Sequence, residues 1–480
     1  MTLKRRDFLK SLSLLPALSC SSSFNSVTPL KKSDKIIVVG AGLAGLSCAR
    51  ILATEGFDVE ILEARERVGG RVHSTVVGSI EGIDLGGSYL HGGPENPLRR
   101  FFDSQDFSIV NHGDVEIFLS HLQQINLFNY RDYWTEVEMK LEEVAAMPYL
   151  MAYLRSLLSL PLPVATLQEM IDRVWSKLAQ HPLKNVAGDD FLHELSNQFF
   201  GVEANKLSLS NLLLEPEVDI AGHGPFPAGE VISRIGLDSM TEQLAKNLKI
   251  NFKTTVKKIQ KIDQSFHLTI DHQGQISEMK ADHLVMAVPL ACYKKNQIEF
   301  DFPLIKEWSQ AIKGLEISHL NKIVLVFKNA FWSKESQSLF LKSQTDRGGA
   351  FYQNLLFHRG EPVLIAFKSG AQAQDCDSKT DDELIATELK LLKSFFPDAS
   401  IDLLAANVSR WGKDELSGGA FSHLGMQAYG TEHSAFQKTS MEKFWITGEF
   451  AHPTDPGTMH GAYLSGQWVA RKMLSQVEGG

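Results

Sequence analysis

The pattern of apolar positions near the start of the chain predicts a strand, a helix and a second strand in close succession. Residues 35–39 form a short β-branched run of the kind that makes a strand buried on both faces. Residues 46–52 open a helix, and residues 57–62 form the next apolar strand. Such a unit predicts a parallel sheet with a crossover helix, which is the core of a doubly wound α/β domain.

The turn between the first strand and the helix carries a glycine pattern that predicts nucleotide binding. The first glycine allows a tight turn, the second lets the backbone approach a pyrophosphate, and the third lets the helix pack against the strand. The helix N-terminus faces the anion. An acid about 20 residues further on is placed to accept hydrogen bonds from a ribose diol. The expected contacts are Gly40, Gly42, Leu43, Ala44, Gly45 and Glu63.

The segments that follow this unit resemble the flavin-dependent amine oxidase family. A Gly-Gly-Arg stands at residues 69–71 and a Gly-Gly-Ser at residues 86–88. Paired glycines permit close backbone approach, and an arginine fork suits a phosphate. The family includes monoamine oxidases, polyamine and spermine oxidases, flavin histone demethylases and L-amino-acid oxidases, and the resemblance implies that the nucleotide is FAD. It also implies cofactor contacts from Ala64, Arg65, Gly70, Arg71, Gly86, Gly87 and Ser88.

Motifs in the second half of the chain extend the resemblance to about residue 472, in the family's order. The resemblance implies that the backbone of Val256 holds the adenine, and that Gly448 and Glu449 contact the ribityl and diphosphate region. It also places a helix N-terminus, at Thr458 and Met459, against the pyrimidine edge of the flavin. The positive end of the helix dipole would stabilise an anionic reduced ring there.

A lone lysine begins a strongly apolar strand at residues 320–327, and a Phe-Trp pair follows the strand. From the residues alone, Lys322 could simply extend its ammonium to solvent from a strand end. The flanking pattern resembles the strand that carries the family's lysine beside flavin N5. The resemblance therefore implies that Lys322 is catalytic and holds a water close to N5.

Departures from the family pattern refine the prediction. Monoamine oxidases attach FAD to a cysteine near the last helix, but no cysteine follows Cys376, so we expect non-covalent FAD. Those enzymes also clamp the amine between two tyrosines. Here Phe421 stands at the first position and Thr458 at the second, so one wall is absent, as in some histone demethylases. Trp411, in the segment that leads to Phe421, is a further expected substrate contact.

Residues 87–98 resemble a segment of polyamine oxidases, with Tyr89 in place of a tryptophan. By this resemblance His91 lines the substrate channel. A histidine beside glycine could equally be a hydrogen-bonded loop residue, and the sequence leaves both interpretations open.

The alternation of these motifs predicts two discontinuous domains. The FAD-binding domain comprises residues 35–105, 222–295 and 440–475, and the substrate domain comprises residues 106–221 and 296–439. We expect the substrate domain to pair an antiparallel sheet with a helical insertion that begins near residue 111 and includes residues 136–160 and 164–178. Residues 250–262 predict one strand, and residues 265–280 predict a hairpin. The active site is expected between the domains.

Composition excludes several other classes of protein. The 480 residues are 43% hydrophobic and carry a net charge of −9, which argues against a nucleic-acid partner. No apolar run approaches the roughly 18 residues that span a bilayer, so no stable membrane span is expected. The four cysteines form neither a CxxC nor a regular spacing, so we predict neither a disulfide framework nor a metal site.

Residues 1–34 are predicted to be a targeting segment and linker. Arg5 and Arg6, followed by Phe8 and Leu9, match the twin-arginine signal pattern, and a short apolar region follows. The expected partner is the twin-arginine translocase, and the expected location is the periplasm. Cys20 weakly resembles the cysteine of a lipoprotein signal, so lipid anchoring is a less favoured alternative.

The predicted activity is the FAD-dependent oxidation of an amine C–N bond to an imine, with O2 reduced to H2O2. The expected substrates are a small-molecule amine, polyamine-like or another primary or secondary amine, and O2. Two alternatives stay open. One is a desaturase or protoporphyrinogen-oxidase-like flavoenzyme, because these proteins share the N-terminal motifs. The other is a non-catalytic flavoprotein.

Overall fold

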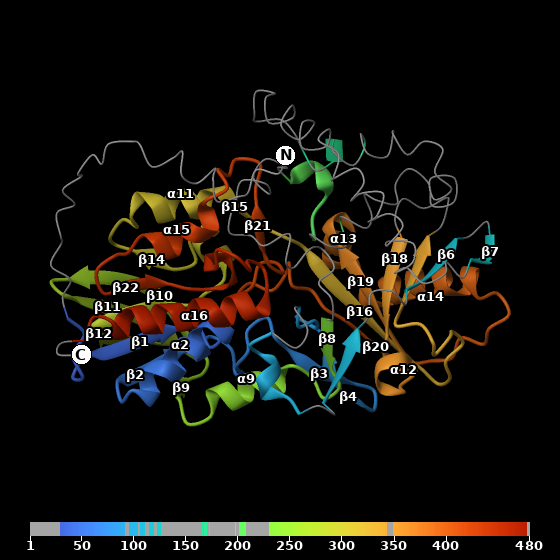
Figure 1. The fold of residues 1–480 in the computed structure, drawn as a ribbon, viewed down its shortest axis with the longest axis horizontal. Helices are drawn as coiled ribbons and strands as arrows, with labels where there is room; N and C mark the ends of the chain where they lie inside the picture. Colours follow the sequence, from blue (N-terminus) through green and yellow to red (C-terminus); the bar gives the residue numbers. More distant parts are fainter. Residues whose placement is uncertain are drawn as a thin grey trace, which may run out of the picture.

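The computed structural model describes residues 29–91, 96–103, 106–110, 115–119, 122–125, 201–207, 230–342 and 349–477, together with residues 166, 168, 169, 172 and 197. Figure 1 shows two lobes, one built around a parallel sheet and the other around a larger sheet rich in antiparallel pairs. Residues 1–28 of the predicted targeting segment and linker, and most of the predicted helical insertion, lie outside the described residues.

The first lobe is built on a five-stranded parallel sheet with the order β22-β13-β1-β2-β9. Its strands come from three separated parts of the chain, as the sequence predicts. They are β1 (Lys35–Val39), β2 (Asp58–Leu62), β9 (Lys249–Asn251), β13 (His283–Met286) and β22 (Phe444–Ile446). The predicted doubly wound α/β architecture is confirmed.

Both faces of the sheet are buried at β1, which explains why this strand is apolar from Ile36 to Val39. Ile36 and Val38 of β1 pack into one hydrophobic cluster, while Ile37 and Val39 pack into another on the opposite face. The first cluster includes residues of three helices, which are α2 (Leu43–Thr54), α9 (Asp238–Ala245) and α16 (Met459–Leu474). In Figure 1, α16 lies alongside α2.

Small residues let α16 and α2 approach closely. A methyl group added at Gly466 would lie only 2.0 Å from the carbonyl oxygen of Ala44. The hydroxyl of Ser47 donates a hydrogen bond to the carbonyl of Tyr463 at 2.8 Å. These contacts fix α16 against α2, the helix that begins at the glycine fingerprint.

A mostly antiparallel sheet, in which β10 and β14 pair in parallel, covers the other face in the order β12-β11-β10-β14. Its strands are β10 (Thr254–Ile262), β11 (Ser265–His272), β12 (Gln275–Ala281) and β14 (Glu299–Phe300). The predicted hairpin is confirmed, but the prediction of one strand over residues 250–262 is wrong. Lys253 has φ +51, so the chain turns there and passes from β9 in the parallel sheet to β10 in the antiparallel one.

Three short helices also pack on this face, namely α10 (Leu290–Lys294), α11 (Lys306–Gly314) and α15 (Glu432–Lys438). Trp308 of α11 is fully buried, and its ring centroid lies 6.2 Å from that of Phe444 in β22. The two ends of the segment 296–439 therefore pack with the parallel sheet of the first lobe. The exact domain bounds stay a prediction.

The second lobe is a seven-stranded sheet with the order β20-β16-β19-β18-β17-β6-β7. Its strands are β6 (Val115–Leu119), β7 (Leu122–Ile125), β16 (Leu320–Phe327), β17 (Ser338–Lys342), β18 (Gly349–Asn354), β19 (Val363–Ser369) and β20 (Leu403–Val408). Neighbouring strands of this sheet pair antiparallel, except β17 with β6, which pair in parallel. The expectation of helix from residue 111 is wrong for residues 115–119 and 122–125, which form strands, and residues 136–160 lie outside the described chain.

The central strand β16 has two different surroundings. Ile323, Leu325 and Phe327 pack in a cluster that also contains residues of α14 (Asp381–Phe395). Val324 and Val326 face the opposite way, into a cluster with the hairpin of β3 (Ser74–Val77) and β4 (Ile80–Asp84) in the first lobe. Because strand side chains alternate, Lys322 lies on this second face. The strand thereby presents its lysine to the FAD-binding lobe.

The remaining described elements connect these layers. They are β3 (Ser74–Val77), β4 (Ile80–Asp84), β5 (Phe107–Val110), β8 (Glu230–Ser233), β15 (Leu315–Ile317), β21 (Ser422–Leu424), α12 (Leu355–Arg359), α13 (Gly370–Ser378), α14 (Asp381–Phe395), and the 3-10 turns η2 (Arg99–Phe101), η3 (Ala204–Lys206) and η4 (Glu449–Ala451). After β22 the chain turns into η4.

Candidate active site

The three fingerprint glycines have the environments that the sequence predicts. Gly40 has φ +105, and a methyl group there would lie 2.6 Å from the carbonyl oxygen of Ala287. A methyl group at Gly45 would lie 1.9 Å from the carbonyl oxygen of Gly40, so the helix packs directly on the turn. At Gly42 an added methyl group meets nothing within 4 Å. Gly42 therefore borders open space, as a close approach to a diphosphate requires.

The polar groups around this space fit an anionic dinucleotide. Leu43, Ala44 and Gly45 form the first turn of α2, where backbone amides have no partner within the helix, and Gly42 provides no side-chain cap. Glu63 is buried at the carboxyl end of β2, and its carboxylate accepts hydrogen bonds from the amides of Ala41 at 2.7 Å and Arg65 at 2.8 Å. This places Glu63 beside the fingerprint turn, where a ribose diol is expected.

Val256 lies close to this end of the first lobe. The amide of Thr254 donates to the carbonyl of Glu63 at 2.9 Å, which fixes the start of β10 beside the acid. Val256 is buried, and a β-bulge follows it in the pairing with β11. The bulge interrupts the ladder of backbone hydrogen bonds at the residue that the resemblance assigns to the adenine. Its contact with adenine stays a prediction.

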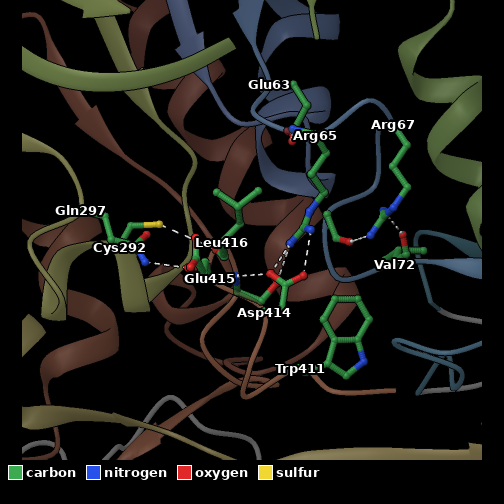
Figure 2. A network of polar contacts seen from close by, with 12 residues as sticks. Glu63, Arg65, Arg67, Val72, Cys292, Gln297, Trp411, Asp414, Glu415 and Leu416 are labelled. Carbon is green, nitrogen blue, oxygen red and sulfur yellow. Dashed lines mark hydrogen bonds and ion pairs between the residues drawn. The ribbon is translucent and has the colours of Figure 1, made fainter. Parts of the chain in front are cut away.

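The loop after Glu63 is held by an arginine that the sequence analysis did not select. Arg67 donates from its guanidinium to the carbonyls of Val68, Gly70 and Val72, at 3.0, 2.9 and 3.4 Å (Figure 2). Gly70 has φ +59, and a methyl group added there would lie 3.5 Å from the Cα of Gly42. Arg67 thus folds the Gly-Gly-Arg turn onto the fingerprint. Its position within the motif was the signal that could have found it.

Arg65, Arg71 and Glu449 link this loop to other segments. Arg65 makes a bidentate ion pair with Asp414, with distances of 2.6 and 2.9 Å, as Figure 2 shows. Arg71 donates to the carboxylate of Glu449 and to the carbonyl of Ala420, both at 2.8 Å. Both arginines therefore have protein partners, and their contacts with the cofactor stay predictions.

Glu449 is a buried carboxylate that joins three segments. Besides Arg71 it accepts from the hydroxyl of Ser422 at 2.6 Å and from the amide of Gly457 at 3.2 Å. The preceding Gly448 leaves room for the ring of Phe450, because a methyl group there would lie 2.7 Å from that ring. Glu449 therefore acts as a junction between the FAD loop, β21 and the turn before α16.

Lys322 is 1% exposed, so the interpretation that it extends to solvent is wrong. Its ammonium donates to the carbonyl of Asp84 at 2.8 Å and to that of Gly86 at 2.6 Å. It also lies 5.0 Å above the ring of Phe367 on the neighbouring strand β19. The indole of Trp411 donates to the intervening carbonyl, that of Leu85, at 2.9 Å. The backbone carbonyls of three consecutive residues of the FAD lobe thus accept hydrogen bonds from the side chains of Lys322 and Trp411 in the substrate lobe.

Burial shifts the acid–base properties of Lys322 and Asp84. Desolvation lowers the pKa of Lys322 to about 8, although the negative charge of Asp84 opposes the shift. Desolvation also raises the pKa of the Asp84 carboxyl to about 6, against the charge of Lys322 and two hydrogen bonds. Those bonds come from the hydroxyl of Ser74 and the amide of Leu237, at 2.6 and 2.9 Å. The sequence analysis named Lys322 but did not select Asp84.

Gly86, Gly87 and Ser88 connect Lys322 with the start of α16. A methyl group at Gly86 would lie 1.9 Å from the carbonyl oxygen of Arg71, and one at Gly87 would lie 2.8 Å from the sulfur of Met459. Ser88, the next residue in the sequence, is also buried. The predicted cofactor contacts at these positions therefore lie in one connected region with Lys322.

The expected amine wall lies at the edge of the same region. A methyl group at Gly457 would lie 3.3 Å from the ring of Phe421. The hydroxyl of Thr458 caps α16 by accepting from the amide of Gly461 at 2.9 Å, and it donates to the carbonyl of Asp455 at 2.8 Å. Thr458 thus has a structural role at the helix N-terminus. The backbone amide of Trp411 donates to the side chain of Asn321 at 2.8 Å.

His91 lies at the other side of the α16 N-terminus. Its carbonyl accepts from the amide side chain of Asn96 at 2.6 Å, and its ring centroid lies 6.5 Å from that of His460. His460 in turn contacts Asp455 at 3.1 Å. Burial raises the pKa of Asp455, but the side chains of His460, Thr454 and His452 lower it by a larger amount, so the net shift is downward. The structure leaves the role of His91 in a substrate channel a prediction.

In the described ranges, no group of three or more histidine, cysteine or acidic residues is placed to hold a metal ion. Over the same ranges, no helix combines the length and apolar character needed to cross a membrane. The open space at Gly42, the first turn of α2 and the buried carboxylate of Glu63 together fit a dinucleotide.

Comparisons with known proteins identify the family of the chain. The model of a family described as flavin-containing amine oxidoreductase matches residues 43–474. Lysine-specific histone demethylase 1 homolog 2 of Oryza sativa subsp. japonica is 28% identical over 464 residues, which are 94% of this chain and 58% of that protein. Polyamine oxidase 2 of Arabidopsis thaliana is 28% identical over 454 residues, which are 93% of this chain and 89% of that protein.

A solved structure shares the fold. It is a triple mutant of putrescine oxidase with redesigned cofactor binding, and it matches with a TM-score of 0.68 at 18% identity over 92% of this chain and 99% of that one. The chain belongs to the flavin-containing amine oxidoreductase family. It is an oxidoreductase whose cofactor is FAD, as the resemblance in the sequence implied.

Proposed function

We propose that this protein oxidises the C–N bond of a small-molecule amine, with FAD as the cofactor and O2 as the final acceptor. In balanced form, the amine loses two electrons and two protons to become an imine, and O2 becomes H2O2. Water then hydrolyses the imine to a carbonyl compound and the remaining amine. The family match supports this reaction, and the relatives named as polyamine oxidases favour a polyamine-like substrate.

The observation that carries the proposal is the position of Lys322. Lys322 is fully buried, donates to two carbonyls of the FAD lobe and has a lowered pKa. Burying a charged group in this way costs folding free energy, so we expect a functional reason for it. Lys322 lies in one connected region with Gly86, Gly87 and Met459. In this place its Nζ can hold a water molecule or move a proton without exposure to bulk solvent.

The chain's own residues fit FAD. Gly42, the first turn of α2 and Arg71 would hold the diphosphate, and Glu63 would accept from a ribose diol. When bound, FAD supplies the capacity to accept a hydride equivalent from the substrate and to pass electrons to O2. The protein positions the amine, excludes water and holds the proton at Lys322 Nζ.

Phe421 and Trp411 are the residues proposed to contact the amine. The ring of Phe421 offers an aromatic face, which attracts a cation or a neutral amine. Trp411 is 7% exposed and binds both lobes, through Leu85 and Asn321, so it would support the wall rather than move with the substrate. Thr458, the residue at the second wall position, caps α16, which leaves a single aromatic wall.

A peroxide-coupled screen tests the proposal. The purified, FAD-loaded protein would be mixed with polyamines, aromatic amines and L-amino acids, and H2O2 would be measured with a peroxidase. We expect turnover with at least one amine class and loss of turnover in Lys322→Met. Flavin reduction by a porphyrinogen or another C–C substrate, with none by any amine, would favour the desaturase-like alternative. A protein that no substrate reduces would be a non-catalytic flavoprotein.

We also propose export through the twin-arginine route to the periplasm, with the twin-arginine translocase as partner. The support is the motif at residues 4–10 and the fact that this route carries folded proteins, which suits a cofactor loaded in the cytoplasm. Lipid attachment at Cys20 is the alternative end point. Both positions lie outside the described residues.

A further inference from the structure

One segment of the substrate domain, residues 414–420, is held by polar contacts with the loop that follows Glu63 and with residues in and just after α10. Arg65 binds Asp414 and also donates to the hydroxyl of Ser417 at 3.0 Å. Gln297 donates to the carbonyl of Glu415 at 2.6 Å, and the thiol of Cys292 lies 3.8 Å from the carbonyl oxygen of Leu416 (Figure 2).

The two ends of this segment carry the proposed amine contacts. Trp411 stands three residues before Asp414, and Phe421 follows Ala420, whose carbonyl accepts from Arg71. Arg65 and Arg71 both belong to the loop that follows Glu63 and wraps the cofactor site. A single loop of the FAD lobe therefore contacts both the start and the end of the segment that supports the amine wall.

Among these contacts the ion pair of Arg65 and Asp414 is the strongest. It is bidentate, its side chains are only 17% and 25% exposed, and the amide of Ser417 also donates to the carboxylate, at 2.8 Å. The guanidinium holds the pKa of Asp414 below its ordinary value, against the effect of burial. The pair is thus ionised at neutral pH, and its geometry specifies one position of the segment.

We propose that Arg65, Asp414 and Ser417 form a latch that positions the amine wall and couples it to retention of FAD. The proposal concerns positioning residues and rests on the proposed function, because it assigns the wall to an amine. Since the latch joins the cofactor loop to the wall, weakening it from the substrate side should loosen both. Binding energies at two sites that share such an element are reciprocally linked.

The same loop offers a matched control. Glu66 forms an ion pair with Lys253 at 2.9 Å, and this pair is exposed, with side chains 75% and 48% accessible. Exposed pairs of this kind contribute little. Asp414→Asn and Glu66→Gln both replace a carboxylate by an amide of the same shape. The two variants therefore differ in whether they weaken the latch.

The first readout is hydrogen exchange of the FAD-loaded protein, followed by mass spectrometry on peptides that cover residues 411–421. We expect exchange in this segment to rise about fivefold or more in Asp414→Asn and in Arg65→Gln, the lower range of typical coupling between sites. Glu66→Gln should match the wild type. The double variant Arg65→Gln with Asp414→Asn should exchange no faster than the faster single variant, because the partners act as a unit.

The second readout is the rate of FAD release, followed by the rise of flavin fluorescence after dilution. Asp414→Asn should release FAD faster than the wild type, although it lies in the substrate domain. Ser417→Ala, which keeps the charge pair, should give a smaller change in the same direction. The melting temperature of each FAD-loaded variant shows whether it is folded before either measurement.

The third readout is steady-state kinetics with the best amine from the screen. The latch predicts a higher KM in Asp414→Asn with a smaller change in kcat, because the wall binds the amine but takes no part in the chemical step. Wild-type exchange in both latch variants, or additive effects in the double variant, would overturn the latch. Faster exchange with unchanged KM and FAD release would overturn the coupling. If the wild type oxidises no amine, the proposed function fails, while exchange and FAD release still test the latch.

Discussion

The side chain of Lys322 binds the backbone carbonyl of Asp84 and not its carboxylate. The ammonium of Lys322 donates to the carbonyl of Asp84, while the carboxylate of Asp84 accepts from Ser74 and Leu237. A strand of the substrate lobe is thereby joined to the last strand of the β3–β4 hairpin in the FAD lobe. The buried charge of Asp84 still acts on Lys322, since it opposes the loss of the proton.

Removing this ammonium tests the catalytic role. Lys322→Met should keep the fold and FAD, because Ile323 to Phe327 provide the packing of β16 and methionine resembles the aliphatic part of lysine. Flavin reduction, reoxidation or both should slow at least about tenfold, equivalent to about 1.4 kcal/mol. Anaerobic stopped-flow reduction, followed by mixing with O2, separates the two half-reactions. Wild-type rates in both halves would leave Lys322 without a catalytic role.

The same buried pair predicts two opposite dependences of stability on pH. The pKa of Lys322 is about 8 in the folded state and about 10.5 when exposed, so the folded state binds its proton less tightly. Below about pH 8 the buried ammonium lowers the free energy of unfolding by its full amount. This penalty disappears as the pH rises from about 8 to about 10.5. Relative to Lys322→Met, the wild type should gain up to about 1.4 kcal/mol per pH unit in that window.

For Asp84 the sign is reversed. Its pKa is about 6 when folded and 3.8 when exposed, so the folded state loses stability as the pH rises from about 3.8 to about 6. Relative to Asp84→Asn, the wild type should lose stability over that range. Urea unfolding of the FAD-loaded variants across pH measures both windows. A flat difference for either residue would contradict its shifted pKa.

Glu63 should contribute to FAD retention. Glu63→Gln replaces a charged acceptor by a neutral one, and a charge-assisted hydrogen bond is roughly twice as strong. The variant should release FAD faster on dilution than the wild type. As a companion measurement, acid precipitation should release all flavin as free FAD, because no cysteine follows Cys376 in the chain. Flavin that remains in the precipitate would show a covalent link.

Phe421 should bind the amine without taking part in the chemical step. Phe421→Ala removes an aromatic face worth about 0.5–2 kcal/mol to a cation or amine. We therefore expect a KM increased by up to about thirtyfold, with a smaller effect on the rate of flavin reduction at saturating amine. Phe421→Tyr keeps the aromatic face and is the control. An unchanged KM in Phe421→Ala would remove this residue from the amine site.

Export should depend on the two arginines near the start of the chain. Arg5→Lys with Arg6→Lys keeps the charge but breaks the twin-arginine pattern, so the precursor should stay in the cytoplasm, folded and loaded with FAD. Fractionation of cells, followed by flavin fluorescence of each fraction, measures this. Unchanged accumulation in the periplasm would point to another route.

The sequence by itself determined the features that depend on neighbours along the chain. The fingerprint around Gly40 and Gly42, the acid Glu63 and the strand of Lys322 follow from spacing within about 30 residues, because turns, caps and apolar periodicity act locally. Only the tertiary structure decided which side chains meet across long distances. Lys322 meets the carbonyl of Asp84 across 238 residues, and Arg65 meets Asp414 across 349. Periodicity predicts the face on which a side chain lies, but its partner depends on how the lobes pack.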